Sequence, residues 1–144
     1  GPDVNRPRAH RAALVADLDG DGDLDILITA LDARPVLLRN QLDPKGGSLI
    51  IRLRGTASNR EGIGARVDLT AGGRVQMRQM TRGGGYLSSS DAITHFGLGS
   101  LPRAEAVRIS WPSGKVDTLG PLDARTTYII EEGGRIVQKV PHRS

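Results

Sequence analysis

Apolar residues alternate with polar ones over short runs along most of the chain, a pattern typical of β-strands with one buried face. Between residues 48 and 54, Leu49, Ile51 and Leu53 alternate with residues that include two arginines. The same pattern predicts strands over residues 13–16, 24–30, 36–40, 48–54, 65–70, 74–80, 104–111, 116–119, 126–131 and 135–140. The sequence DARP at residues 32–35 predicts a turn before the third strand. No helical period is sustained, so we expect an all-β protein.

Turn-forming residues separate these runs and divide the chain into two units. The glycine pairs at residues 72–73 and 133–134 stand between adjacent runs and predict β-hairpins. Residues 42–47, with the sequence LDPKGG, contain turn formers and no apolar pattern, which indicates a linker. We therefore expect one unit of three short strands over residues 1–43. The second unit, residues 44–144, is expected to be an antiparallel β-sandwich or barrel.

Five aspartates occupy alternate positions between the first two predicted strands. They are Asp17, Asp19, Asp21, Asp23 and Asp25. Such a density of negative charge repels itself unless a cation lies among the carboxylates. Calcium takes roughly 6–8 oxygen ligands. The side chains at the first, third, fifth and ninth positions and the backbone carbonyl of Asp23 would supply these oxygens, with Gly22 allowing the sharp turn. The sequence therefore predicts a Ca²⁺ site in this loop.

Two alternatives to this calcium loop follow from the same residues. An EF-hand would need an acidic residue at the twelfth position and a helix after it. Ile28 stands at that position, and the run that follows the loop is a predicted strand. A solvated acidic turn without an ion is the other alternative. It gives no reason for carboxylates at the first, third, fifth and ninth positions with glycine at the sixth.

The two predicted units differ in charge. Residues 1–43 contain five arginines and eight aspartates, whereas residues 44–144 contain fifteen basic and eight acidic residues. The basic residues do not cluster with aromatic ones, and no nucleic-acid-binding motif is present, so we expect no nucleic acid partner. The absence of cysteine excludes a disulfide framework. No apolar run approaches the roughly 18 residues of a membrane span.

Two other groups of polar residues suggest a chemistry. Ser88, Asp91 and His95 lie close in sequence, but no nucleophile elbow is present, so we expect no catalysis and expect His95 to bond a loop backbone. The residues on one face of the strand over residues 74–80 include two arginines and a glutamine, at positions 74, 76 and 78. They would recognise a carboxylated or sulfated glycan. An ordinary solvated strand face is the alternative.

Residues 15–27 closely resemble the FG-GAP/VCBS repeat, in which a DxDGDGxxD loop binds calcium within a β-propeller blade. The resemblance covers about residues 10–42 and implies that all five aspartates of the loop belong to the metal site. One blade cannot close a ring of the usual 4–8 blades. We therefore expect a partial blade, taken from a longer repeat protein, that docks on the unit following it.

Four further motifs, in order along the second unit, resemble the ASPIC/UnbV domain. They cover residues 59–67, 83–89, 95–99 and 111–114. This family commonly follows FG-GAP/VCBS propellers, which implies a noncatalytic calcium-binding adhesion or scaffold module of a secreted or cell-surface protein. Its partner would be a protein or an acidic glycan, and the sequence leaves the oligomeric state open. The alternative, from enediyne-cluster members, is an enzyme or accessory protein of natural-product biosynthesis, which would need a deep cleft around His95.

Overall fold

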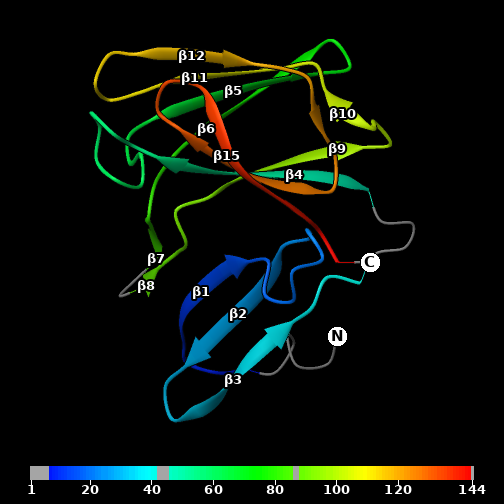
Figure 1. Cartoon of the computed structure of the whole chain (residues 1–144). Helices are drawn as coiled ribbons and strands as arrows, with labels where there is room; N and C mark the ends of the chain where they lie inside the picture. The colour runs from blue at the N-terminus through cyan, green and yellow to red at the C-terminus, as the bar shows by residue number, and fades with distance from the viewer. Residues whose placement is uncertain (1–6, 42–45, 86–87, 144) are drawn as a thin grey trace.

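The computed structural model describes residues 7–41, 46–85 and 88–143. Over these ranges the chain forms strands and turns with no helix, so the all-β prediction is confirmed. A small three-stranded sheet lies on one side of the molecule and a larger two-layered body on the other (Figure 1). Neither part closes into a barrel.

The N-terminal sheet is an antiparallel meander of β1 (His10–Ala16), β2 (Asp25–Ala30) and β3 (Ala33–Leu38). Apolar residues stand on both of its faces. Val15 and Leu37 on opposite faces remain 47% and 48% exposed, and every described apolar residue that is fully buried comes from later in the chain. This sheet therefore has no apolar core of its own.

Several boundaries of the N-terminal sheet differ from the sequence prediction, including the start of β2 at Asp25 and the end of β3 at Leu38. β1 begins at His10, three residues earlier than predicted. The turn predicted at residues 32–35 is wrong, because the chain turns at Leu31 and Asp32 and Pro35 lies within β3. β3 is an edge strand, where the N–H that proline lacks is not required by a neighbouring strand.

The larger body consists of two four-stranded sheets. The first contains, in spatial order, β12 (Val116–Leu119), β11 (Ala106–Ser110), β5 (Arg66–Ala71) and β6 (Arg74–Gln79). The second contains β15 (Arg135–Pro141), β14 (Thr126–Glu131), β4 (Gly47–Arg54) and β9 (Thr94–Gly99). Two short ribbons complete it, β7 (Gly83–Gly85) with β8 (Ser88–Ser89) and β10 (Arg103–Ala104) with β13 (Leu122–Asp123).

One apolar core joins these two sheets into a β-sandwich. Its fully enclosed members include Leu49, Ile51, Phe96 and Tyr128 from one sheet and Val67, Leu69, Val107 and Ile109 from the other. The prediction of an antiparallel sandwich needs one correction, because β4 and β14 pair in parallel. Parallel neighbours need a long crossover connection, and the whole opposite sheet supplies it here.

The other face of β4 points away from this core and toward the N-terminal sheet. Ser48 and Ile50 lie on that face, and they are 4% and 3% exposed although Ile50 does not belong to the apolar core. His95 of β9 and Thr127 of β14 pair with Ile50 and so share its face. This outer face of the sandwich is where the loop between β1 and β2 docks.

Candidate functional site

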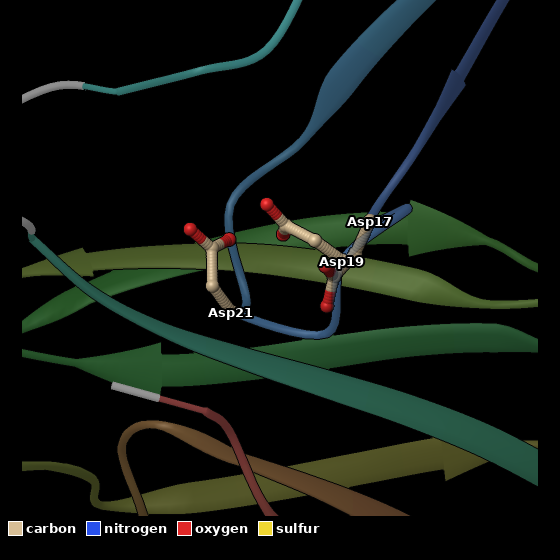
Figure 2. Close-up of side chains that lie close together, drawn as sticks. All are labelled: Asp17, Asp19 and Asp21. Carbon is tan, nitrogen blue, oxygen red and sulfur yellow. The ribbon is translucent and has the colours of Figure 1, made fainter.

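The loop that connects β1 to β2 brings three of the predicted ligands together. Asp17, Asp19 and Asp21 each offer a carboxylate oxygen, and these oxygens lie within 4.8 Å of one another (Figure 2). All three residues are partly buried. The spacing of two residues thus brings three successive carboxylates of the loop close together.

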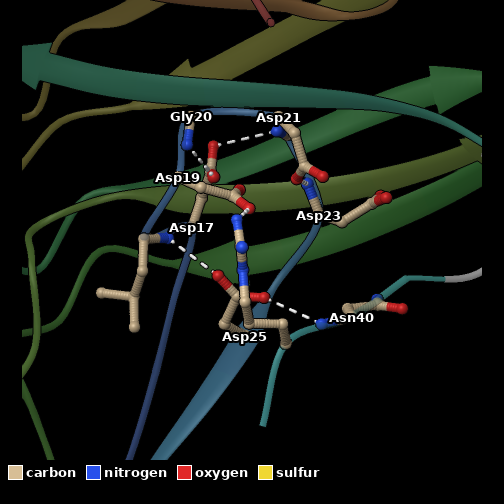
Figure 3. Close-up of polar contacts among 10 residues, drawn as sticks. Asp17, Asp19, Gly20, Asp21, Asp23, Asp25 and Asn40 are labelled. Atoms are coloured by element: carbon tan, nitrogen blue, oxygen red, sulfur yellow. Dashed lines mark hydrogen bonds and ion pairs between the residues drawn. The ribbon is translucent and has the colours of Figure 1, made fainter. Parts of the chain in front are cut away.

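Backbone N–H groups shape the loop around the first of these aspartates. Asp17 accepts hydrogen bonds from the amide of Gly20 at 2.8 Å and from the amide of Gly22 at 3.0 Å. Both glycines have positive φ, +79° and +87°, a conformation that other residues rarely adopt. Asp21 Oδ1 accepts from the amide of Asp23 at 2.9 Å. The alternation of aspartate and glycine thus specifies a tight turn as well as a concentration of charge (Figure 3).

Asp25, the last predicted ligand, closes the base of the loop. It is 1% exposed and accepts hydrogen bonds from the amides of Leu18 at 3.2 Å and Asn40 at 2.9 Å (Figure 3). Its side chain therefore ties the first residues of the loop to the segment after β3. Neither Asp25 nor Asp23, whose backbone carbonyl was the predicted ligand, belongs to the converging group, which Asp17, Asp19 and Asp21 form.

Asp19 has the least satisfied carboxylate of the loop. Its Oδ2 pairs with the guanidinium of Arg39, an interaction that raises the pKa of Arg39. Its Oδ1 is buried and has no hydrogen-bond partner among the described residues. A buried carboxylate oxygen without a partner is costly unless a cation satisfies it. The donor set around it consists of hard oxygen ligands, which suit Ca²⁺.

The carbonyl of Gly22 fixes the loop to the sandwich. It accepts hydrogen bonds from Ser48 Oγ at 2.6 Å and from His95 Nε2 at 2.8 Å. A carbonyl oxygen can only accept, so Nε2 of His95 carries the hydrogen. This confirms the prediction that His95 bonds a loop backbone. A further bond runs from the amide of Arg143 to the carbonyl of Gly20 at 2.8 Å.

His142 packs between the loop and the sandwich. Its Nδ1 lies 3.4 Å from Ser48 Oγ and its Nε2 3.1 Å from Thr127 Oγ1. Because the Ser48 hydroxyl donates its only hydrogen to Gly22, Nδ1 of His142 donates to Ser48. The Thr127 hydroxyl can donate to Nε2 or accept from it, so this second contact suits either form of the imidazole. Burial lowers the pKa of His142, which outweighs the opposite effect of the Asp17 carboxylate.

A cleft of about 270 Å³ runs beside the loop along the outer face of the sandwich. Its lining includes Asp17, His142 and the apolar side chains of Ile50 and Ile129. Arg52, which also lines it, pairs with Asp91 at 2.7 Å. His95 does not line this cleft, because its ring is turned toward Gly22. Asp91 and His95 thus make separate contacts, with Arg52 and with Gly22.

The polar residues of β6 share one face, but it is the face that points toward the opposite sheet. Gln76 donates to the carbonyl of Gly97 at 2.8 Å. Arg78 lies over the Phe96 ring, with its guanidinium carbon 5.6 Å from the ring centre. These two side chains bridge the open side of the sandwich between β6 and β9, and Arg74 lines a groove beside them.

Three residues of the site had no local signal in the sequence. Ser48 follows the predicted linker, His142 follows β15 and Arg39 follows β3. Each of them meets the acidic loop only through the folding of distant segments. The signal for the loop itself, five alternating aspartates, carries no information about what packs against it.

Comparisons with known proteins identify relatives of this chain. A family model described as ASPIC and UnbV matches residues 55–137, which excludes the acidic loop. Cartilage acidic protein 1 from Homo sapiens is 35% identical over 124 residues, covering 82% of this chain and 18% of that protein. The proteins of the same name from Mus musculus and Xenopus tropicalis are 33% and 29% identical, over 82% and 81% of this chain and 19% and 18% of theirs. The chain thus spans less than a fifth of the length of these relatives.

Within its described residues, no helix has the length and apolar character needed to cross a membrane.

Proposed function

Because the chain belongs to the ASPIC and UnbV family, we propose that it is a noncatalytic adhesion or scaffold module of an extracellular protein, with a structural Ca²⁺ ion in its acidic loop. The relatives named cartilage acidic protein 1 support an extracellular location, since cartilage is an extracellular matrix. The calcium loop would belong to an FG-GAP/VCBS-type blade at the end of a β-propeller. A protein or an acidic glycan would be its partner.

The observation that carries the calcium proposal is the buried Oδ1 of Asp19. It lacks a hydrogen-bond partner among the described residues, and carboxylate oxygens of Asp17 and Asp21 lie within 4.8 Å of an Asp19 oxygen. A bound Ca²⁺ would neutralise these carboxylates and complete the bonding of Asp19. Asp25 and the carbonyl of Asp23 would provide further oxygens. Calcium fits this set better than magnesium, which holds fewer ligands in stricter octahedral geometry.

Calorimetric titration of the metal-free protein with CaCl₂, followed by thermal melting, tests this function. We expect measurable binding and a rise in melting temperature, because the ion binds the folded loop and the unfolded chain offers no cage. At a calcium concentration 100 times the Kd, the stabilisation would be about 2.7 kcal/mol. Magnesium at the same concentration should give a smaller shift.

A double variant, Asp19→Ala with Asp21→Ala, should lose both the binding heat and the calcium-dependent melting shift. The matched control is Asp123→Ala, which removes one exposed carboxylate from the sandwich far from the loop along the chain. It should bind calcium as the parent does. A parent protein that gives no binding heat and melts at the same temperature with calcium or chelator would refute the calcium function.

A further inference from the structure

The contacts of Gly22 point to a role of the sandwich in the calcium site. We propose that Ser48 and His95 are positioning residues for the ion. Calcium binding and the docking of the N-terminal sheet on the sandwich then form one coupled equilibrium. This inference rests on the calcium function proposed above. It adds that the ion controls how the two parts of the molecule are joined.

The peptide group between Gly22 and Asp23 connects the acidic loop to the sandwich. Its carbonyl, from Gly22, accepts from Ser48 at 2.6 Å and from His95 at 2.8 Å. Its N–H, from Asp23, donates to Asp21 Oδ1 at 2.9 Å. The peptide group is planar and rigid, so donors that fix the carbonyl also fix the direction of the N–H. The sandwich thereby orients the carboxylate of Asp21.

Gly20 provides a second connection, through the two successive peptide groups that meet at this residue. Its amide donates to Asp17 Oδ1 at 2.8 Å, and its carbonyl accepts from the amide of Arg143 at 2.8 Å. The segment after β15 therefore holds the residue that shapes the first aspartate of the loop. Two of the three converging carboxylates are thus linked through one loop residue each to the sandwich or its C-terminal segment.

The interface between the loop and the sandwich has no spare room at Gly22. A Cβ added to this buried glycine would lie 2.0 Å from Nδ1 of His142. Ile50, on the outer face of β4, is 3% exposed although it lies outside the sandwich core. The loop is therefore seated in a fitted position, and a shift of the N-terminal sheet would disturb these contacts together.

The direction of the coupling follows from thermodynamic reciprocity. If docking arranges the carboxylates for the ion, the ion must strengthen docking by the same factor. The N-terminal sheet has no buried apolar core, so these contacts and the ion make up much of what fixes it. Loss of the Ser48 and His95 donors should therefore weaken calcium binding although neither side chain is a ligand.

Calorimetric measurement of the calcium Kd in four variants tests this proposal. Ser48→Ala and His95→Leu each remove one donor to Gly22, and each should raise the Kd roughly threefold, with a rise of about tenfold when they are combined. His95→Gln keeps an N–H donor and should restore much of the affinity. The control, Thr118→Ala, changes an exposed residue of the opposite sheet and should leave the Kd unchanged.

Hydrogen exchange of the Arg143 amide provides a second readout that does not depend on affinity. In the parent protein, calcium should slow its exchange, because that amide donates to Gly20 of the loop. In the combined variant, calcium should slow it much less. A parent that binds no calcium would overturn both proposals. A parent that binds calcium while the combined variant binds it equally tightly would overturn the coupling alone and leave the calcium function standing.

Discussion

In the sandwich, Leu49, Tyr128 and Ile130 are at most 1% exposed, whereas in the N-terminal sheet Val15 and Leu37 remain about half exposed. The sandwich encloses an apolar core between two sheets, and the burial of that core stabilises it. The smaller sheet has no such core and is fixed by hydrogen bonds to aspartates and by docking. Two stabilising principles thus operate in one short chain, and the proposed metal ion would add only to the second.

The same contrast separates the carboxylates of the two parts. Glu132, 6% exposed, accepts at Oε2 from the amides of Thr56, Ala57 and Ser58 at 2.8, 2.8 and 2.7 Å. Its Oε1 accepts from the hydroxyls of Ser58 and Ser113. Asp19 instead retains a buried oxygen with no partner among the described residues. The sandwich satisfies its buried carboxylate with its own donors, whereas the acidic loop would need the proposed cation to satisfy Asp19.

The largest difference between the two regions should appear when one apolar side chain is truncated in the sandwich and one in the N-terminal sheet. Ile130→Ala removes a fully buried side chain and should lower the free energy of unfolding by about 2–5 kcal/mol. Leu37→Ala removes one that is 48% exposed and should cost about 1 kcal/mol or less. Urea denaturation followed by Trp111 fluorescence and circular dichroism measures both. Equal losses would mean that the N-terminal sheet has a core of its own.

A smaller effect should separate two glycines that share a backbone conformation. Gly22 and Gly73 have φ of +87° and +69°, so alanine at either position carries a conformational cost of about 1–2 kcal/mol. At Gly73 the new methyl group meets nothing within 4 Å, whereas at Gly22 it would lie 2.0 Å from Nδ1 of His142. Gly22→Ala should therefore destabilise more and should also undock the loop. Thermal melting measures the loss of stability, and hydrogen exchange across β1 to β3 measures the undocking of the loop.

If Gly73→Ala loosened the N-terminal sheet as much as Gly22→Ala did, the loop would not be held by its fit against the sandwich. The pair is informative because backbone strain is common to both variants. Only the contact with His142 differs.

Local features of the sequence predicted most of the strands and the position of the acidic loop; the binding of calcium by that loop stays a prediction. The hairpin between β5 and β6 was predicted because its turn, Gly72 and Gly73, is adjacent to both strands, and Ala71 indeed pairs with Arg74. The acidic loop was predicted from its spacing alone. β9 was missed because Gly97 and Gly99 interrupt its apolar alternation. In these cases the information lies within a few residues.

Contacts between distant segments could not be predicted from such local patterns. The parallel pairing of β4 with β14 depends on how the whole intervening sheet folds back. Ser48 and His142, 94 residues apart in sequence, meet only because the loop and the C-terminal segment dock on one face. The sequence supported the expectation that the N-terminal unit docks on its neighbour. It did not indicate that a glycine carbonyl would be the point of attachment.

Acidification should distinguish the carboxylate of Glu132 from ordinary surface carboxylates. Burial alone would raise its pKa, but hydrogen bonds from Ser113, Ser58, Thr56 and Ala57 outweigh burial and lower it from 4.5 to about 2. The contribution of the ionised form is thus complete above about pH 4.5 and is lost as the pH falls toward 2. Melting temperatures of the parent should fall across this window.

Glu132→Gln should melt at a lower temperature at neutral pH and should lose less on acidification. The control, Glu61→Gln, removes an exposed carboxylate paired with Arg82 and should keep the acid dependence of the parent. An unchanged acid profile in Glu132→Gln would show that other groups cause the loss. Chelated protein should be used, so that calcium in the acidic loop does not contribute.

The smallest effect concerns Arg39, the cation that already lies beside the acidic loop. Its guanidinium pairs with Asp19 and is 51% exposed, so Arg39→Gln should change the stability of calcium-free protein by less than about 1 kcal/mol. The same change frees Asp19 Oδ2 and removes a positive charge near the site. Calcium should therefore bind more tightly, by up to about fivefold.

The charge-matched control for this variant is Arg108→Gln, which removes an exposed arginine from the sandwich sheet that does not contact the acidic loop. Nη1 of Arg108 lies 4.0 Å from Oδ2 of Asp68 in the same sheet. Calorimetric titration with calcium at low ionic strength should show tighter binding for Arg39→Gln and no change for the control. The difference should shrink in high salt, because exposed charges are screened. Weaker binding in Arg39→Gln would instead mean that the arginine holds Asp19 in place for the ion. A side chain of the protein would then help to hold the Asp19 carboxylate in place, as the donors around Glu132 hold that carboxylate.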